Sequence, residues 1–129
     1  LATHNSAREE YGAPPLVWDD NLAGSVQNYT DRCQFSHSNG GGAYGENIAA
    51  STEPGWSIQD AVDQWMAESC AFLATSQNSG HFTQVVWKGT RSVACGITSC
   101  PPHTVFLTDD GGATYIVCRY SPPGNVQGQ

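Results

Sequence analysis

The stretch from Gly80 to Trp87 reads GHFTQVVW and combines β-branched with aromatic residues in one short run. These residue types are enriched in strands, so the run predicts a strand over His81–Trp87. Alternate side chains of a strand point to opposite faces. Neither face would be clearly polar: one carries His81, Thr83, Val85 and Trp87, and the other Phe82, Gln84 and Val86. A strand of this kind predicts a sheet that helices cover on both sides.

Three further runs after Gly80 have the same character, namely Val93–Ile97, Thr104–Leu107 and Thr114–Tyr120. Each predicts a strand. The sequence DDGG at Asp109–Gly112 suits a tight turn, and we expect it to join the last two strands as a hairpin. The sheet is therefore expected to be at least partly antiparallel.

Before Gly80 the apolar residues follow the period of a helix. One helix is predicted from Asp20 to Cys33 and a shorter one from Ala2 to Tyr11. Another begins after Ser57, which forms a capping-box pattern with Asp60. Its apolar stripe consists of Ile58, Ala61, Val62, Trp65, Met66, Cys70 and Leu73. Helices followed by strands indicate an α+β fold.

Length and charge limit the classes of function. A chain of 129 residues fits one domain over residues 1–129, and a monomer is expected. The net charge of -7 disfavours nucleic acid as a partner. No apolar run approaches the ~20 residues of a membrane-spanning helix. Residues 1–10 lack the pattern of a secretion signal, so such a signal is either absent or already removed.

Five cysteines are many for a chain of this size and indicate disulfides in an oxidising compartment. Secretion to the extracellular space is the simplest interpretation. A reduced protein with buried thiols is the alternative, although no C-x-x-C pair is present. Two bridges and one thiol can be chosen from five cysteines in several ways, and the sequence pattern alone leaves the pairing open.

Several separated segments resemble the signature motifs of the CAP superfamily, the cysteine-rich secretory proteins, antigen 5 and pathogenesis-related proteins of class 1. The stretch GHFTQVVW and the stretch YIVCRYSPPGN at Tyr115–Asn125 carry most of the resemblance. His4, Asn5 and Arg8 match the H-N-x-x-R motif, Gly45–Ile48 match G-E-N-[ILV], and Pro15–Leu22 also fit. The resemblance implies a three-layer α-β-α sandwich with a largely antiparallel central sheet, of the plant and fungal secreted type.

The resemblance also implies a central cavity and a disulfide pattern. Its cavity residues would be His37, Glu46, Glu68 and His81. No cofactor is required, but these side chains suit a divalent cation such as zinc. The implied disulfides are Cys33–Cys100 and Cys95–Cys118, with Cys70 as a free thiol. A metal-dependent hydrolase or protease built on the same four residues is an alternative, but no activated nucleophile is recognisable, and enzymatic activity is not favoured.

Lipid binding is the function that the resemblance favours, with a sterol or fatty acid as the ligand. The implied sterol-binding loop consists of Ala49, Ala50, Ser51, Thr52, Glu53, Pro54, Gly55, Trp56 and Ser57. A defence or virulence factor that acts only through a protein partner is a further alternative. Asn28 starts an N-glycosylation sequon and is expected on the exposed side of its helix.

Overall fold

The computed structural model describes residues 1–38, 43–67, 80–106 and 111–124 of the chain. In chain order, its elements are α1 (Ala2–Glu10), β1 (Val17–Trp18), α2 (Asp20–Thr30), β2 (Gly45–Ser51), α3 (Ile58–Met66), α5 (Gly80–Val85), β3 (Ser92–Cys100) and β4 (Ala113–Ser121). None of the described helices has both the length and the apolar character needed to cross a membrane.

The four strands form one sheet in the order β1-β3-β4-β2. Strand β4 lies inside the sheet and pairs antiparallel with both β3 and β2. Strand β1 pairs parallel with the start of β3, through Val17 and Trp18. The expectation of a largely antiparallel sheet is confirmed, and β1 is the parallel exception.

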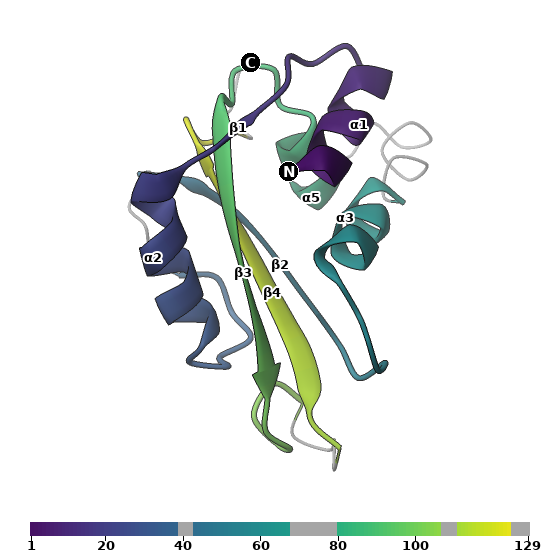
Figure 1. Ribbon diagram of the computed structural model, residues 1–129, viewed down its shortest axis with the longest axis vertical. Helices are drawn as coiled ribbons and strands as arrows, with labels where there is room; N and C mark the ends of the chain where they lie inside the picture. The colour runs from purple at the N-terminus through teal and green to yellow at the C-terminus, as the bar shows by residue number, and fades with distance from the viewer. Residues whose placement is uncertain (39–42, 68–79, 107–110, 125–129) are drawn as a thin grey trace.

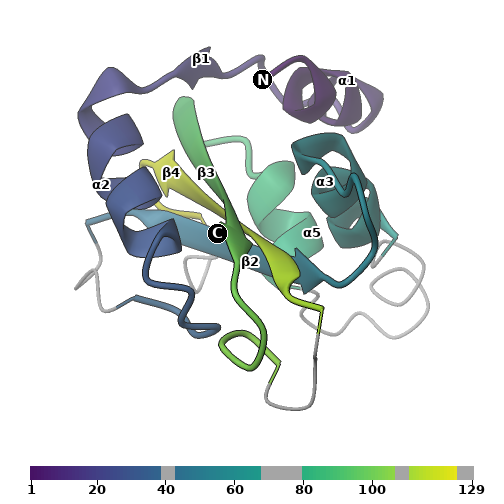
Figure 2. The same ribbon diagram turned by 60° about the horizontal axis from the view of Figure 1, so that its bottom comes forward.

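Helices cover both faces of this sheet, with α2 on one side and α1, α3 and α5 on the other (Figure 1, Figure 2). The side chains of β4 alternate between the two layers. Tyr115 and Val117 pack with Val26 of α2, whereas Ile116 and Tyr120 pack in the other core. The three-layer α-β-α arrangement and the α+β class are therefore confirmed.

The helix starts follow the sequence signals. Asp19 caps α2, because its carboxylate accepts a hydrogen bond from the Asn21 backbone N–H at 2.9 Å. Ser57 and Asp60 form the predicted capping box at the start of α3. Helix α2 ends at Thr30 and not at Cys33, which has a left-handed backbone with φ of 54°. A residue in that conformation cannot continue a right-handed helix.

The strand predicted at His81–Trp87 is wrong, because Gly80–Val85 forms helix α5. Phe82 and Val85 are both buried, and a spacing of three residues places them on one face of a helix. The end of this helix is held by the buried Arg8 guanidinium. It donates to the backbone oxygens of Val85 and Trp87, both at 2.9 Å, and so satisfies acceptors that a helix end leaves without partners.

The strand predicted at Thr104–Leu107 is also wrong for the residues that the structure describes, since 104–106 form turns and bends. Pro101 and Pro102 precede them and cannot donate to a strand ladder. The Thr104 hydroxyl instead donates to the Pro101 oxygen at 2.6 Å. Leu107, Asp109 and Asp110 lie outside the described residues. The antiparallel pair on either side of this connection consists of β3 and β4.

Strand β2 was not predicted, although it contains Glu46 and the beginning of the implied lipid loop. Its sequence, GENIAAS, is poor in the residues that favour strands. Pairing with β4 along its whole length compensates, from Gly45 opposite Tyr120 to Ser51 opposite Thr114. Glu46 thus lies on a strand, and Ala49, Ala50 and Ser51 belong to the sheet and not to a loop.

Two disulfides fasten this framework, and they are the pairs that the resemblance implied. Cys33, just after α2, is bonded to Cys100 at the end of β3. Cys95 and Cys118 are opposite each other on β3 and β4 and form the second bridge. Cys70, expected to be a free thiol, lies outside the described residues.

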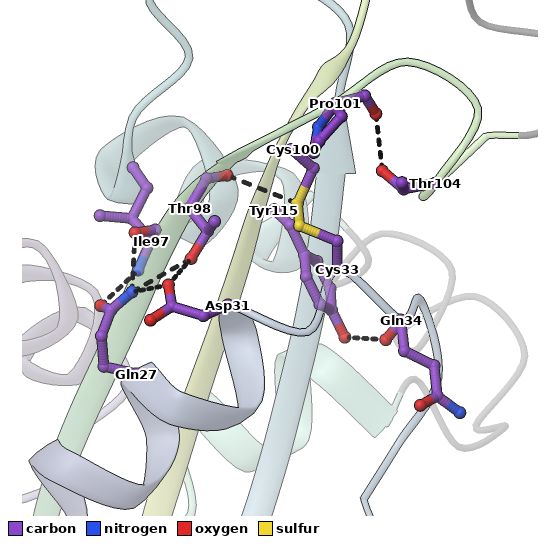
Figure 3. The surroundings of a disulfide bond; sticks show 10 residues. All are labelled: Gln27, Asp31, Cys33, Gln34, Ile97, Thr98, Cys100, Pro101, Thr104 and Tyr115. Atoms are coloured by element: carbon purple, nitrogen blue, oxygen red, sulfur yellow. Dashed lines mark hydrogen bonds between the residues drawn. A yellow bond between two sulfur atoms is a disulfide. The ribbon is translucent and has the colours of Figure 1, made fainter.

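The first bridge lies beside a side-chain contact that links α2 to β3 (Figure 3). The Gln27 amide donates to the Ile97 oxygen at 3.0 Å, and its own oxygen accepts the Ile97 N–H at 3.1 Å. Asp31 accepts from the Thr98 hydroxyl at 2.7 Å, and this bond lowers the pKa of the Asp31 carboxyl. Helix α2 is thereby fixed to β3 by polar bonds as well as by the disulfide.

Candidate functional site

The described members of the implied cavity meet at the free edge of β2. His37 follows α2, Glu46 lies on β2 and His81 lies on α5, a helix where a strand was expected. Together with Asn47 and Gly80 they line a pocket of about 230 Å³. Glu68, the fourth implied residue, lies outside the described residues. The structure therefore brings three distant segments together around one pocket.

The Glu46 carboxylate is engaged on both oxygens. Its Oε1 is 3.1 Å from His37 Nδ1 and accepts the Ser38 backbone N–H at 2.8 Å. Its Oε2 accepts the Ser38 hydroxyl at 2.6 Å and Arg119 Nε at 3.0 Å. The Glu46 side chain is only 6% exposed, so these bonds replace the water that a buried carboxylate would otherwise need. Glu46 thus positions the side chains of His37, Ser38 and Arg119.

Arg119 is the functional residue that sequence reasoning missed. It lies on β4 directly opposite Glu46, and its side chain is 5% exposed. Its guanidinium carbon lies 4.4 Å from the centre of the Tyr44 ring and 5.1 Å from that of Tyr29. Ion pairing and cation–π contacts together offset the cost of burying this charge. The sequence did contain a signal for Arg119, because it is the charged residue within the otherwise largely apolar strand ATYIVCRYS.

Ser38 does not have the surroundings of a nucleophile. Its hydroxyl donates to Glu46, and the Tyr44 hydroxyl lies 2.7 Å away. Glu46 Oε2 also accepts from Arg119 Nε, so this carboxylate is engaged in an ion pair and lacks the arrangement of a base that activates a serine. The geometry favours a structural hydrogen-bond network over acyl-transfer chemistry at this position.

His81 approaches the same pocket from the opposite face of the sheet. Its ring stacks on Trp65 with centroids 6.1 Å apart, and its backbone oxygen accepts a hydrogen bond from Asn47 at 3.0 Å. The donor atoms of His37, Glu46 and His81 are not grouped within 4.8 Å of one another in the described chain. The three residues line a pocket that is large enough for a small molecule. Their donor atoms are too far apart to bind one metal ion together in this arrangement.

Another histidine, His4, does lie close to side chains of the kinds that bind metals. His4, Cys95 and Cys118 have donor atoms within 4.8 Å of one another, but both sulfurs belong to a disulfide and are not available to a metal. His4 is fully buried, and its Nε2 lies 2.7 Å from the Tyr120 hydroxyl. Burial lowers the pKa of His4 to about 3, so this imidazole stays neutral.

An apolar pocket of about 450 Å³ lies between the end of α1 and helix α5. It is lined by Tyr11, Phe82, Thr83, Val86, Trp87, Lys88 and Gly89. The Tyr11 and Phe82 rings meet edge to face with centroids 5.1 Å apart. Arg8 fixes the backbone of the wall through its bond to the Trp87 oxygen. Phe82 and Thr83 of the lining lie on α5, and the other lining residues follow α1 or α5. Among the described residues that line the pocket, Lys88 carries the formal charge.

The implied lipid loop is shorter than expected, because its first three residues are in β2. Residues 52–55 are exposed. Trp56 is half-buried and packs against the core between the sheet and α3. Asn28 of the sequon is exposed on α2, as expected.

Comparisons with known proteins agree with this architecture. The family model for CAP, the cysteine-rich secretory protein family, matches residues 1–120. Fruiting body protein SC14 of Schizophyllum commune is 37% identical over 134 residues, which make up 98% of this chain and 61% of that protein. Pathogenesis-related protein 1A of Nicotiana tabacum is 34% identical over 139 residues, which make up 100% of this chain and 76% of that protein.

Among solved structures, the crystal structure of NaASP2 with Zn²⁺ superposes with a TM-score of 0.79 at 24% identity. The match covers 100% of this chain and 80% of that one. This likeness shows the shared fold. The family model over residues 1–120 and the similarity to the tobacco relative show that the chain belongs to the CAP family of cysteine-rich secretory proteins.

Proposed function

We propose that this chain is a secreted module that binds an apolar lipid, with a fatty acid as the preferred class. The observation that carries the proposal is the apolar pocket between α1 and α5. Its volume of about 450 Å³ lies in the range of small-molecule sites. The two disulfides support secretion, because such bonds persist in oxidising surroundings.

The charge at this pocket distinguishes between lipid classes. Lys88 is exposed and lines the pocket beside the aromatic wall, where it can pair with a carboxylate. A fatty acid offers an apolar chain to Phe82, Val86 and Trp87 and a carboxylate to Lys88. A sterol offers only a hydroxyl at its polar end, so it gains no ion pair.

The test is a titration with a fluorescent fatty acid and, separately, with a fluorescent sterol. Trp87→Ala should weaken fatty-acid binding about 10-fold or more, since buried aromatic contacts dominate such sites. Trp18→Ala removes an exposed tryptophan of β1 and serves as the matched control. Lys88→Gln should weaken binding of the fatty acid but not of its methyl ester. No saturable binding by the wild-type protein would reject the proposal and favour action through a protein partner.

The segment Ala49–Ser57 remains the candidate site for a sterol. Its exposed part, residues 52–55, lies next to Trp56, which packs on the core. If this segment binds the ligand, Trp56→Ala should weaken sterol binding and spare fatty-acid binding, whereas Trp87→Ala should have the reverse effect. Loss of both ligands in both variants would mean that the two sites are not separate.

A second candidate function is zinc binding at the pocket of His37 and His81. Imidazole nitrogens suit zinc, and the contact of Glu46 with His37 Nδ1 leaves Nε2 available to a cation. Glu46 itself is engaged by Ser38 and Arg119, so its role would be to hold His37. Zinc held there would supply a Lewis acid, but no neighbouring group in the described chain has the arrangement of a catalytic nucleophile.

Calorimetric titration with zinc tests this second function. The wild-type protein should bind zinc weakly, and His37→Ala and His81→Ala should each abolish binding. His103→Ala, on the exposed segment after β3, is the control and should bind as the wild type does. Equal affinity in all four proteins would exclude the pocket as a metal site.

A further inference from the structure

A polar pocket of about 530 Å³ lies on the α2 side of the sheet, on the opposite face from the apolar pocket. Its lining consists of Ser25, Asn28, Tyr29, Arg32, Gln34, His37, Ser38 and Arg119. These side chains offer hydroxyls, amides, an imidazole and two guanidinium groups, and no carboxylate is among them. A lining of this kind does not favour a lipid, because an apolar ligand would leave its polar groups without partners.

The charge of this pocket contrasts with that of the whole chain. The net charge is -7, with only five lysine and arginine residues in total, yet Arg32 and Arg119 both face this pocket. Arg32 is exposed, and no carboxylate in the described part of the chain lies within 4.0 Å of it. Because Glu46 neutralises Arg119, the uncompensated positive charge at this pocket is that of Arg32, and such a charge on an acidic protein favours an anionic ligand.

Arg119 adds donors that are fixed in direction. Its Nε bonds to Glu46, Nη1 donates to the Ser25 hydroxyl at 3.3 Å and Nη2 to the Ser38 hydroxyl at 3.0 Å. A guanidinium has five N–H donors, so one on each terminal nitrogen remains for a ligand. Because the group is held between two aromatic rings, little further side-chain entropy is lost when it binds.

The volume of the pocket and its other polar side chains indicate a ligand larger than an inorganic ion. A volume of about 530 Å³ is far larger than an inorganic anion requires. Asn28 and Gln34 each offer an amide donor and acceptor, and Tyr29 offers a phenol oxygen and a ring. Such groups match a ring that carries many hydroxyls. We propose that this pocket binds an acidic saccharide, a sugar whose ring carries a carboxylate or a sulfate ester.

The proposal is independent of the lipid site and can be tested by calorimetry with defined probes. The probes are a galacturonic acid trisaccharide, a sulfated galactose trisaccharide, a neutral galactose trisaccharide and inorganic sulfate. The protein should be made in a host that adds no N-glycan, because Asn28 lines the pocket. The variant is Arg32→Gln, and the matched control is Arg91→Gln, which removes the same charge from an exposed position that does not line the pocket.

We expect the wild-type protein to bind at least one acidic trisaccharide at least 10-fold more tightly than the neutral one. Arg32→Gln should weaken that binding about 10-fold or more, since a charge-assisted hydrogen bond is lost, and Arg91→Gln should change it less than 2-fold. Which acidic probe binds identifies the anionic group. Equal binding of the neutral trisaccharide, equal binding of sulfate alone, no binding of either acidic probe, or no difference between the two variants would overturn the proposal.

Discussion

His4 provides the sharpest prediction, because it links one buried contact to a measurable pH dependence. Its pKa is lowered from 6.5 to about 3 in the folded protein, mainly by burial. Asn47 donates to the Tyr120 oxygen at 3.3 Å, so the Tyr120 hydroxyl can donate to His4 Nε2. The imidazole proton is then on Nδ1, which is buried without a hydrogen-bond partner in the described structure. A second proton on the imidazole would have to bind at Nε2, where it would displace the hydrogen bond that the Tyr120 hydroxyl donates.

The direction in which pH changes the free energy of unfolding depends on how many protons His4 binds in the folded and in the unfolded chain. Below pH 6.5 the unfolded chain binds a proton at His4, whereas the folded chain does not do so until about pH 3. The free energy of unfolding is therefore highest above pH 6.5 and falls as the pH is lowered through that window. One unit of pKa corresponds to about 1.36 kcal/mol, so the loss between pH 7 and pH 5 is about 2 kcal/mol.

Urea unfolding at pH 7, 6 and 5 measures this loss. His4→Gln should show a decrease about 2 kcal/mol smaller than the wild type over this interval, whatever its absolute stability. His103 is exposed, so His103→Gln should lose stability between pH 7 and pH 5 as the wild type does. The His4 ring signals of folded wild-type protein should also not titrate between pH 7 and pH 5 in NMR spectra. The same pH slope in wild type and His4→Gln, with a His4 titration near pH 6.5, would refute this reasoning.

Three further predictions concern how α2 is held to β3, each checked by chemical denaturation. Replacing Cys33 and Cys100 together by alanine should cost about 4 kcal/mol, because the bridge closes a separation of 67 residues; a loss below about 1 kcal/mol would contradict the entropic account. Gln27→Ala should cost about 1 to 2 kcal/mol through its two bonds to Ile97, and an unchanged midpoint would mean that water replaces them. Gly96→Ala should cost about 1 to 3 kcal/mol, since the added Cβ would lie 3.0 Å from the Gln27 Cα, and a neutral result would show that α2 can shift freely.

The parts of the fold that sequence predicted best are those with local signals. The capping box at Ser57 fixed the start of α3, and the run after Ala113 gave a buried strand at nearly its true bounds. Both signals lie within a few residues of the element that they specify. The disulfide partners came from the family resemblance, because cysteine spacing alone allows several pairings.

The parts that sequence could not predict depend on contacts between distant segments. Helix α5 is held by Arg8, whose bond to the Val85 oxygen spans 77 positions. The pair of Arg119 and Glu46 spans 73 positions and follows from the register of β2 against β4. No local pattern reports either contact. Short apolar runs such as FTQVV are compatible with both helix and strand, so tertiary contacts decide between them.

The position of the Gln27 amide has a consequence for how copies of this protein behave toward each other. Strand β1 covers β3 only at its first residues, so β3 would otherwise present an outer edge to which another chain could add a strand. At Ile97 the amide of Gln27 occupies both the donor and the acceptor of that edge, as a neighbouring peptide group would. At this position the edge of β3 is thereby closed to pairing with a strand of another copy, and the protection comes from one side chain of a helix.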